Sequence, residues 1–170
     1  MRIDPKYFNQ FMVVLAVTGI VTIALASLYY VGKQEQRFLG RLDDSDPSAF
    51  RFVTLQGDTL AIPSDRNTIL LFWATWSERS LEELYDLYSW HDRHPEYEVV
   101  AAFVKDAAEF AEAHYRPERP GFHIVNGTGV YQDLRAPGVP TAIIFGPGHQ
   151  VMHTQSGSGT RPVWREMEAR

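Results

Sequence analysis

The chain has 170 residues, a formal net charge of -5 and no cysteine. This length suits one compact domain with an appendage, and 45% hydrophobic with 22% charged residues is a globular composition. The absence of cysteine excludes a disulfide framework, a cysteine-ligated metal site, a thiol nucleophile and dithiol redox chemistry. The acidic balance argues against a nucleic-acid-binding protein, so no nucleic acid partner is expected.

An uncharged apolar stretch runs from Phe11 through Gly19 to Val31, after an N-terminal tail of residues 1–10. As a helix, residues 11–31 would reach roughly 30 Å, enough to cross the hydrocarbon core of a bilayer. A cleaved signal peptide is the alternative, but its apolar core would be shorter and followed by a small-residue cleavage site. The pattern therefore favours a retained single-pass anchor that contacts lipid through residues 11–31.

The segment after the anchor is polar and rich in turn-forming residues. Residues 32–50 contain glycine, proline and an acidic cluster, which predicts a short tether to a domain at residues 51–170. Basic residues flank the anchor on both sides, so the positive-inside rule does not decide its orientation.

The rest of the chain alternates strand-like and helix-like patterns. The expected elements are a hairpin at 52–55 and 59–62, a buried strand at 68–73, a helix at 80–93, a buried strand at 98–104, short helices at 107–115 and 128–134, a strand at 141–145, its hairpin partner at 150–154 and a terminal helix at 161–170 with Thr160 as N-cap. This order predicts an α/β fold in which helices cover both faces of a mixed sheet.

Two motifs lie at the ends of predicted strands. Residues 72–76 read FWATW, and residues 138–141 read GVPT. The pair resembles the FWATWC and GVPT segments of thioredoxin-like proteins, in which the proline is cis. With the hairpin and the anchor, the resemblance over about residues 48–165 narrows to the membrane-anchored, TlpA-like thiol–disulfide oxidoreductases. It implies a thioredoxin-like fold, and a domain on the periplasmic side of the bacterial inner membrane.

The chain departs from this family at its catalytic motif. Where the family has Cys-x-x-Cys, the matching residues are Ser77-Glu78-Arg79-Ser80. A serine hydroxyl cannot form a disulfide and is too weak an acid to replace a thiolate, so no catalytic residue is expected. Ser77 is interpreted as a helix cap, and Ser80 with Glu83 fits a capping-box spacing. A serine nucleophile is the rival, but it would need a general base and an oxyanion hole.

Other residues near the motif are candidates for contacts. Trp76 would border the former active-site groove. Its side chain is expected either to form part of the groove wall or to pack in the core, and the sequence does not decide between the two. In the family the residue before the cis-proline offers its backbone to an extended polypeptide, so Val139 and Pro140 would keep that groove. Tyr85 and Trp90 make the first helix of the domain aromatic, either as core or as partner contacts.

His91 and His94 lie three residues apart near the end of a predicted helix. They could ligate a metal, but no third ligand is apparent, so a solvated helix end is favoured. No metal and no cofactor are expected.

These observations leave several functions open. The favoured one is a redox-inactive, membrane-anchored subunit with a scaffolding role in a larger membrane protein complex, such as a photosynthetic or respiratory one, with integral membrane subunits as partners. The alternative is a polypeptide-binding assembly chaperone or adaptor, for example in cytochrome maturation. An enzyme of another class with a histidine-bound metal ranks below both.

Overall fold

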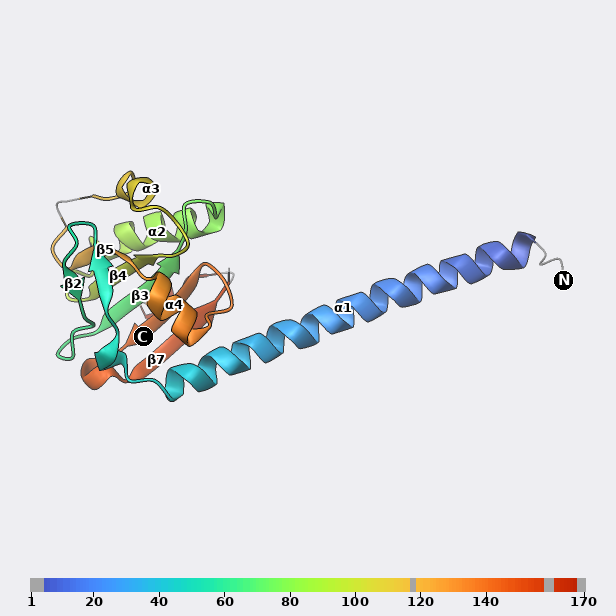
Figure 1. Cartoon of the computed structure of the whole chain (residues 1–170), viewed down its shortest axis with the longest axis horizontal. Coiled ribbons are helices and arrows are strands. Elements are labelled where there is room, and N and C mark those ends of the chain that lie inside the picture. The colour runs from blue at the N-terminus through green and yellow to red at the C-terminus, as the bar shows by residue number, and fades with distance from the viewer. Residues whose placement is uncertain (1–4, 117–118, 158–160, 168–170) are drawn as a thin grey trace. The chain divides into compact units, whose positions relative to one another are not determined.

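A computed structural model of the chain describes residues 5–116, 119–157 and 161–167 (Figure 1). Contacts divide the chain into two compact units, Met1–Arg37 and Phe38–Arg170. The described part of the first unit is helical, and the second unit contains a sheet with helices.

The helix α1 extends over Pro5–Asp43. It is long and apolar enough to cross a membrane, and its large apolar side chains, such as Phe11 and Leu28, are exposed. The helix continues well beyond Val31, so most of the predicted tether is helical. A short 3₁₀ turn, η1, follows at Pro47–Ala49.

The last turns of α1 belong to the second unit. Phe38 and Leu42, four residues apart on one face of the helix, are buried in its core. Arg41 donates a hydrogen bond to the carbonyl of Asp133 at 3.0 Å. The compact unit therefore begins at Phe38, upstream of the expected domain start at residue 51.

The strands of the second unit form one sheet in the order β2-β1-β5-β4-β3-β6-β7. β3, β4 and β5 are parallel neighbours, and the remaining pairs are antiparallel. The mixed sheet predicted from the sequence is confirmed. The strand bounds are β1 Phe52–Thr54, β2 Thr59–Leu60, β3 Thr68–Trp73, β4 Glu98–Phe103, β5 Phe122–Asn126, β6 Thr141–Phe145 and β7 Val151–Ser156.

One strand was absent from the sequence prediction. β5 lies between the two short helices and pairs with β4 in parallel and with β1 in antiparallel orientation. It is only five residues long, and His123 and Asn126 interrupt its apolar pattern. Its position in the middle of the sheet, rather than its own hydrophobicity, makes it a strand.

Helices cover both faces of the sheet, as predicted. The cluster on one face includes side chains of α2 (Glu78–His91) and α5 (Val163–Met167). The cluster on the other face includes the end of α1 and α4 (Thr128–Leu134). Thr160, the expected cap of the terminal helix, lies outside the described residues.

α4 approaches β4 closely at its first turn. A Cβ on Gly127 would lie 2.5 Å from the Cβ of Ala102 and 3.3 Å from the ring of Phe72. Only glycine permits this approach, which brings the start of α4 against the sheet.

Candidate functional site

The candidate site lies where β3 ends and α2 begins. The connecting loop is held to the turn after β4 by Asp106, whose Oδ2 accepts from the backbone N–H of Thr75 at 2.8 Å and from its hydroxyl at 2.6 Å. The Val104 N–H donates to the Trp73 carbonyl at 3.0 Å as the two strands part. The loop that carries Trp76 and Ser77 is therefore fixed at the carboxyl ends of two parallel strands.

Ser77 is the N-cap of α2, as predicted. Its backbone is extended, and its Oγ accepts from the Ser80 N–H at 3.3 Å and from the Ser80 hydroxyl at 3.0 Å. Ser80 is fully buried inside the first turn of the helix. The expected capping box of Ser80 and Glu83 is wrong, because Ser80 is not at the cap position.

The two serines form no nucleophilic site among the described residues. Their hydroxyls hydrogen-bond to each other, and none of the described histidines hydrogen-bonds to either of them. A serine nucleophile would need such a base to take its proton.

Glu83, one turn after Ser80, is a site residue whose role the sequence did not indicate. It is 3% exposed, and its Oε1 has no hydrogen-bond partner, although the Arg79 Nε lies 3.8 Å away. Burial raises the pKa of Glu83 to about 7, and the charge of Arg79 opposes this shift. A cavity of about 250 Å³ adjoins it, lined by Arg79, Glu82, Glu83, Asp86 and Pro162. Ser77, Ser80 and Glu83 follow one another at intervals of three residues. This helical spacing is the sequence signal that could have linked Glu83 to the serine motif.

The GVPT loop adjoins the end of β3, the strand that leads to the serine motif. The Val139–Pro140 peptide bond is cis, and the Thr141 hydroxyl donates to the Gly138 carbonyl at 2.7 Å. Thr141 pairs with Phe72 in the antiparallel register of β6 and β3, so the loop meets the end of β3. Val139 is half-buried and Pro140 is buried.

The aromatic candidates separate by exposure. Trp76 is 63% exposed, which excludes core packing and leaves it as a surface residue next to Ser77. Tyr85 is 39% exposed, and its hydroxyl lies 2.6 Å from His114 Nδ1. Trp90 is only 1% exposed, so its expected role as a partner contact is wrong, and it packs in the core against His94 and Tyr97.

The histidine pair at the end of α2 is not a solvated pair. His91 is buried, its Nε2 lies 3.1 Å from the Tyr97 carbonyl, and burial lowers its pKa. His94 lies beyond the helix and stacks on Trp90. Within the described ranges, no group of three or more His, Asp or Glu side chains could hold a metal ion.

Solved structures with this arrangement of strands and helices are known. A secreted disulfide oxidoreductase of Mycobacterium tuberculosis, homologous to Escherichia coli DsbE, superposes with a TM-score of 0.60 at 14% identity, over 76% of this chain and 95% of its own. StoA from Bacillus subtilis has a TM-score of 0.53 at 23% identity, over 68% and 92%. The domain has the thioredoxin-like fold.

A thiol–disulfide oxidoreductase from Bacteroides fragilis agrees, with a TM-score of 0.58 at 14% identity, over 74% of this chain and all of its own. No protein-family model matches the sequence, and no curated protein matches it significantly. The fold predicted from FWATW and GVPT is thus confirmed by structural similarity. The chain contains no cysteine, so its own residues cannot carry out thiol–disulfide exchange.

Proposed function

We propose that this chain is a redox-inactive, membrane-anchored thioredoxin-like subunit with a scaffolding role in a larger membrane protein complex. Energy-transducing complexes, photosynthetic or respiratory, are the proposed hosts, and their integral membrane subunits are the proposed partners. The observation that carries the proposal is the mutual hydrogen bond of Ser77 and Ser80, because it turns the thiol position into a structural cap.

The surface beside this cap supports a role in protein contact. Trp76 exposes a large aromatic ring next to the serine motif, which has no thiol. Aromatic residues are enriched at protein interfaces. Phe110 in α3 (Ala108–Glu112) is equally exposed, and α3 follows the Asp106 turn that holds the Trp76 loop. These side chains are the proposed partner contacts, together with Tyr85.

The anchor supports a place in a membrane complex. The apolar part of α1 exposes its side chains over the length that a bilayer core requires. The proposed location is the bacterial inner membrane, crossed once, with the thioredoxin-like domain in the periplasm. In support, one structurally similar oxidoreductase is a secreted protein.

Solubilisation of native membranes in mild detergent tests the scaffolding role. The full chain is expected to migrate well above its monomer mass and to co-purify with integral membrane proteins in fixed stoichiometry. The Trp76→Ala variant is expected to lose most of that material, whereas Val53→Ala, at an exposed residue of β1, should retain it. Migration of the wild-type chain alone at its monomer mass would overturn the proposal.

A second candidate is a polypeptide-binding assembly chaperone or adaptor, for example in cytochrome maturation. The cis Val139–Pro140 bond and the exposed Trp76 favour it, because they adjoin the paired ends of β6 and β3, where an extended chain could bind. This function predicts transient, substoichiometric capture that is lost in both Val139→Asp and Trp76→Ala. Stable stoichiometric association would instead support the scaffold.

Redox inactivity has a direct assay with an internal control. The wild-type chain is expected to show no reduction of insulin disulfides above the buffer rate. The double variant Ser77→Cys/Ser80→Cys restores a dithiol at hydroxyls that lie 3.0 Å apart and should show a measurable rate. Either single variant should remain inactive, because exchange through an internal disulfide needs two thiols.

A further inference from the structure

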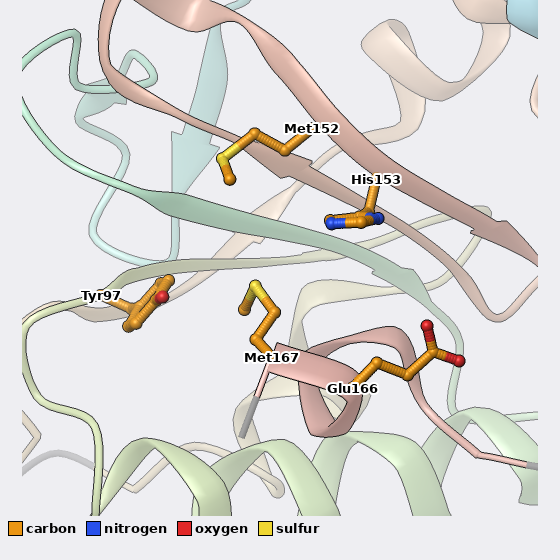
Figure 2. A pocket seen from close by; sticks show the side chains of 5 residues that line it. All are labelled: Tyr97, Met152, His153, Glu166 and Met167. Atoms are coloured by element: carbon orange, nitrogen blue, oxygen red, sulfur yellow. The ribbon is translucent and has the colours of Figure 1, made fainter. Parts of the chain in front are cut away.

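A second cavity lies between β7 and α5, away from the serine motif. It has a volume of about 180 Å³ and is lined by Tyr97, Met152, His153, Glu166 and Met167 (Figure 2). The side chains of Met152, His153 and Met167 point into this space, whereas the Glu166 carboxylate points away from the two sulfur atoms. One imidazole and two thioethers therefore face the same cavity.

Few methionines are present in the chain, and two of them line this cavity. The sequence has four methionines, and the two outside the N-terminal segment, Met152 and Met167, both line the cavity. Met167 comes from α5 and Met152 from β7, so the pair is brought together by the fold.

A β-bulge in β7 explains how the consecutive residues Met152 and His153 can both line the cavity. In the register of β6 and β7, Ile144 pairs with His153 and Phe145 pairs with Val151, which leaves Met152 without a partner. Successive side chains of a regular strand point to opposite faces, and a bulge re-aims a side chain. The bulge therefore allows Met152 and His153 to line the same space.

His153 differs from the other histidines in its contacts. His91, His94, His114, His123 and His149 each have a hydrogen-bonding partner. For His153, no hydrogen bond, ion pair or ring contact is found within the described part of the chain. Its half-buried ring is thus uncommitted and faces two sulfur atoms.

We propose that Met152, His153 and Met167 bind one Cu(I) ion. Thioether sulfur is a soft ligand that selects Cu(I), and imidazole also suits copper. Hard cations such as Mg²⁺ and Ca²⁺ prefer several oxygen ligands, carboxylates above all, and the Glu166 carboxylate points away from the two sulfur atoms. Because thioethers carry no proton at any working pH, two of the three ligands are available without deprotonation. The site is independent of the serine motif and of the proposed scaffolding role.

Titration of the detergent-solubilised full chain with Cu(I) tests the site. Under anaerobic, reducing conditions and in competition with a chromogenic Cu(I) chelator, one Cu(I) per chain is expected, with sulfur and nitrogen scatterers in X-ray absorption. The absence of cysteine makes the assay clean, because no thiol competes for the ion. Failure of the wild-type chain to take copper from the weakest chelator would overturn the proposal.

Variants assign the ligands. Met152→Leu/Met167→Leu removes both sulfur atoms while nearly conserving volume, and it should weaken Cu(I) binding at least tenfold without a large change in thermal unfolding. His153→Asn should also weaken binding and remove the nitrogen scatterer. Met12→Leu in α1 and His149→Asn, whose Nε2 contacts the Ile62 carbonyl, are the matched controls and should bind as the wild type does.

An apolar cavity that methionines merely fill is the competing explanation. It predicts equal Cu(I) binding, or none, in the wild type and in the leucine double variant. If that double variant fails to fold, the His153→Asn variant still tests the site, because His153 is only half-buried. Unchanged Cu(I) binding and an unchanged X-ray absorption spectrum in His153→Asn would overturn the proposed site.

Discussion

The Ser77 hydroxyl satisfies two donors at once. It accepts the Ser80 N–H, one of the free amides at the start of α2, and the hydroxyl of the fully buried Ser80. A helix cap contributes about 1 kcal/mol, and a buried donor without a partner costs about 1–3 kcal/mol. The Ser77–Ser80 pair therefore stabilises the fold.

The Ser77→Ala variant measures this contribution. Losing the cap and stranding the Ser80 hydroxyl should lower the free energy of unfolding by about 2 kcal/mol, measured by chemical denaturation. Ser89→Ala is the control on the same helix, since its exposed hydroxyl only donates back to the Tyr85 carbonyl. It should change stability by less than about 0.5 kcal/mol, and an equal loss in both variants would contradict the cap.

Glu83 makes stability depend on pH. Its pKa is raised by burial from 4.5 to about 7, so the folded state holds a proton that the unfolded state has released between these values. Stability should therefore fall as pH rises from about 4.5 to 7, by up to about 3 kcal/mol, and level off above.

The Glu83→Gln variant should remove this dependence. Its stability relative to the wild type is expected to grow through that pH window, as measured by urea denaturation at several pH values. Glu82→Gln, at an exposed neighbour in the same helix, should follow the wild-type profile. Parallel profiles for Glu83→Gln and the wild type would contradict a buried, protonated carboxyl group.

At the scale of elements, α1 has two environments along its length. Its apolar part is exposed, but Phe38 and Leu42 pack with Phe52, Phe72 and Phe145 in one of the two core clusters. A single helix thus provides an apolar segment long enough to span a membrane and then part of the domain core. Polar residues around Phe38 made this segment read as a tether in the sequence.

The Phe38→Ala variant tests that second environment. Truncating a fully buried phenylalanine should cost about 3–5 kcal/mol of unfolding free energy in the domain. Leu39→Ala, at the next and exposed position, should cost far less. Thermal unfolding of the full chain in detergent compares the two, and similar midpoints would show that the turn does not belong to the core.

At the scale of the whole molecule, the compact unit begins at Phe38. A chain lacking residues 1–37 should therefore fold and remain in the supernatant after ultracentrifugation, while the full chain should stay in membranes washed with carbonate. A chain starting at residue 44 loses Phe38 and Leu42 and should unfold at a clearly lower temperature. Carbonate-extractable full-length protein would contradict a spanning helix.

Local patterns were sufficient for most elements of the domain. The continuous apolar run of β3 and the helical spacing of α2 identified both elements, and FWATW with GVPT identified the fold. The sequence failed at β5, whose short polar-interrupted pattern becomes a strand only between β1 and β4. Pairing across the sheet is a long-range property that no local window contains.

The sequence by itself determined the long apolar segment, the thioredoxin-like fold of the domain and the absence of any thiol. These follow from residue identity and short-range periodicity, which folding does not alter. Only the tertiary structure decided that Trp76 is exposed and Trp90 buried, that burial raises the pKa of Glu83, and that Met152, His153 and Met167 line one cavity. Burial and convergence depend on which distant segments pack together, because solvation and ligand geometry are set by neighbours in space.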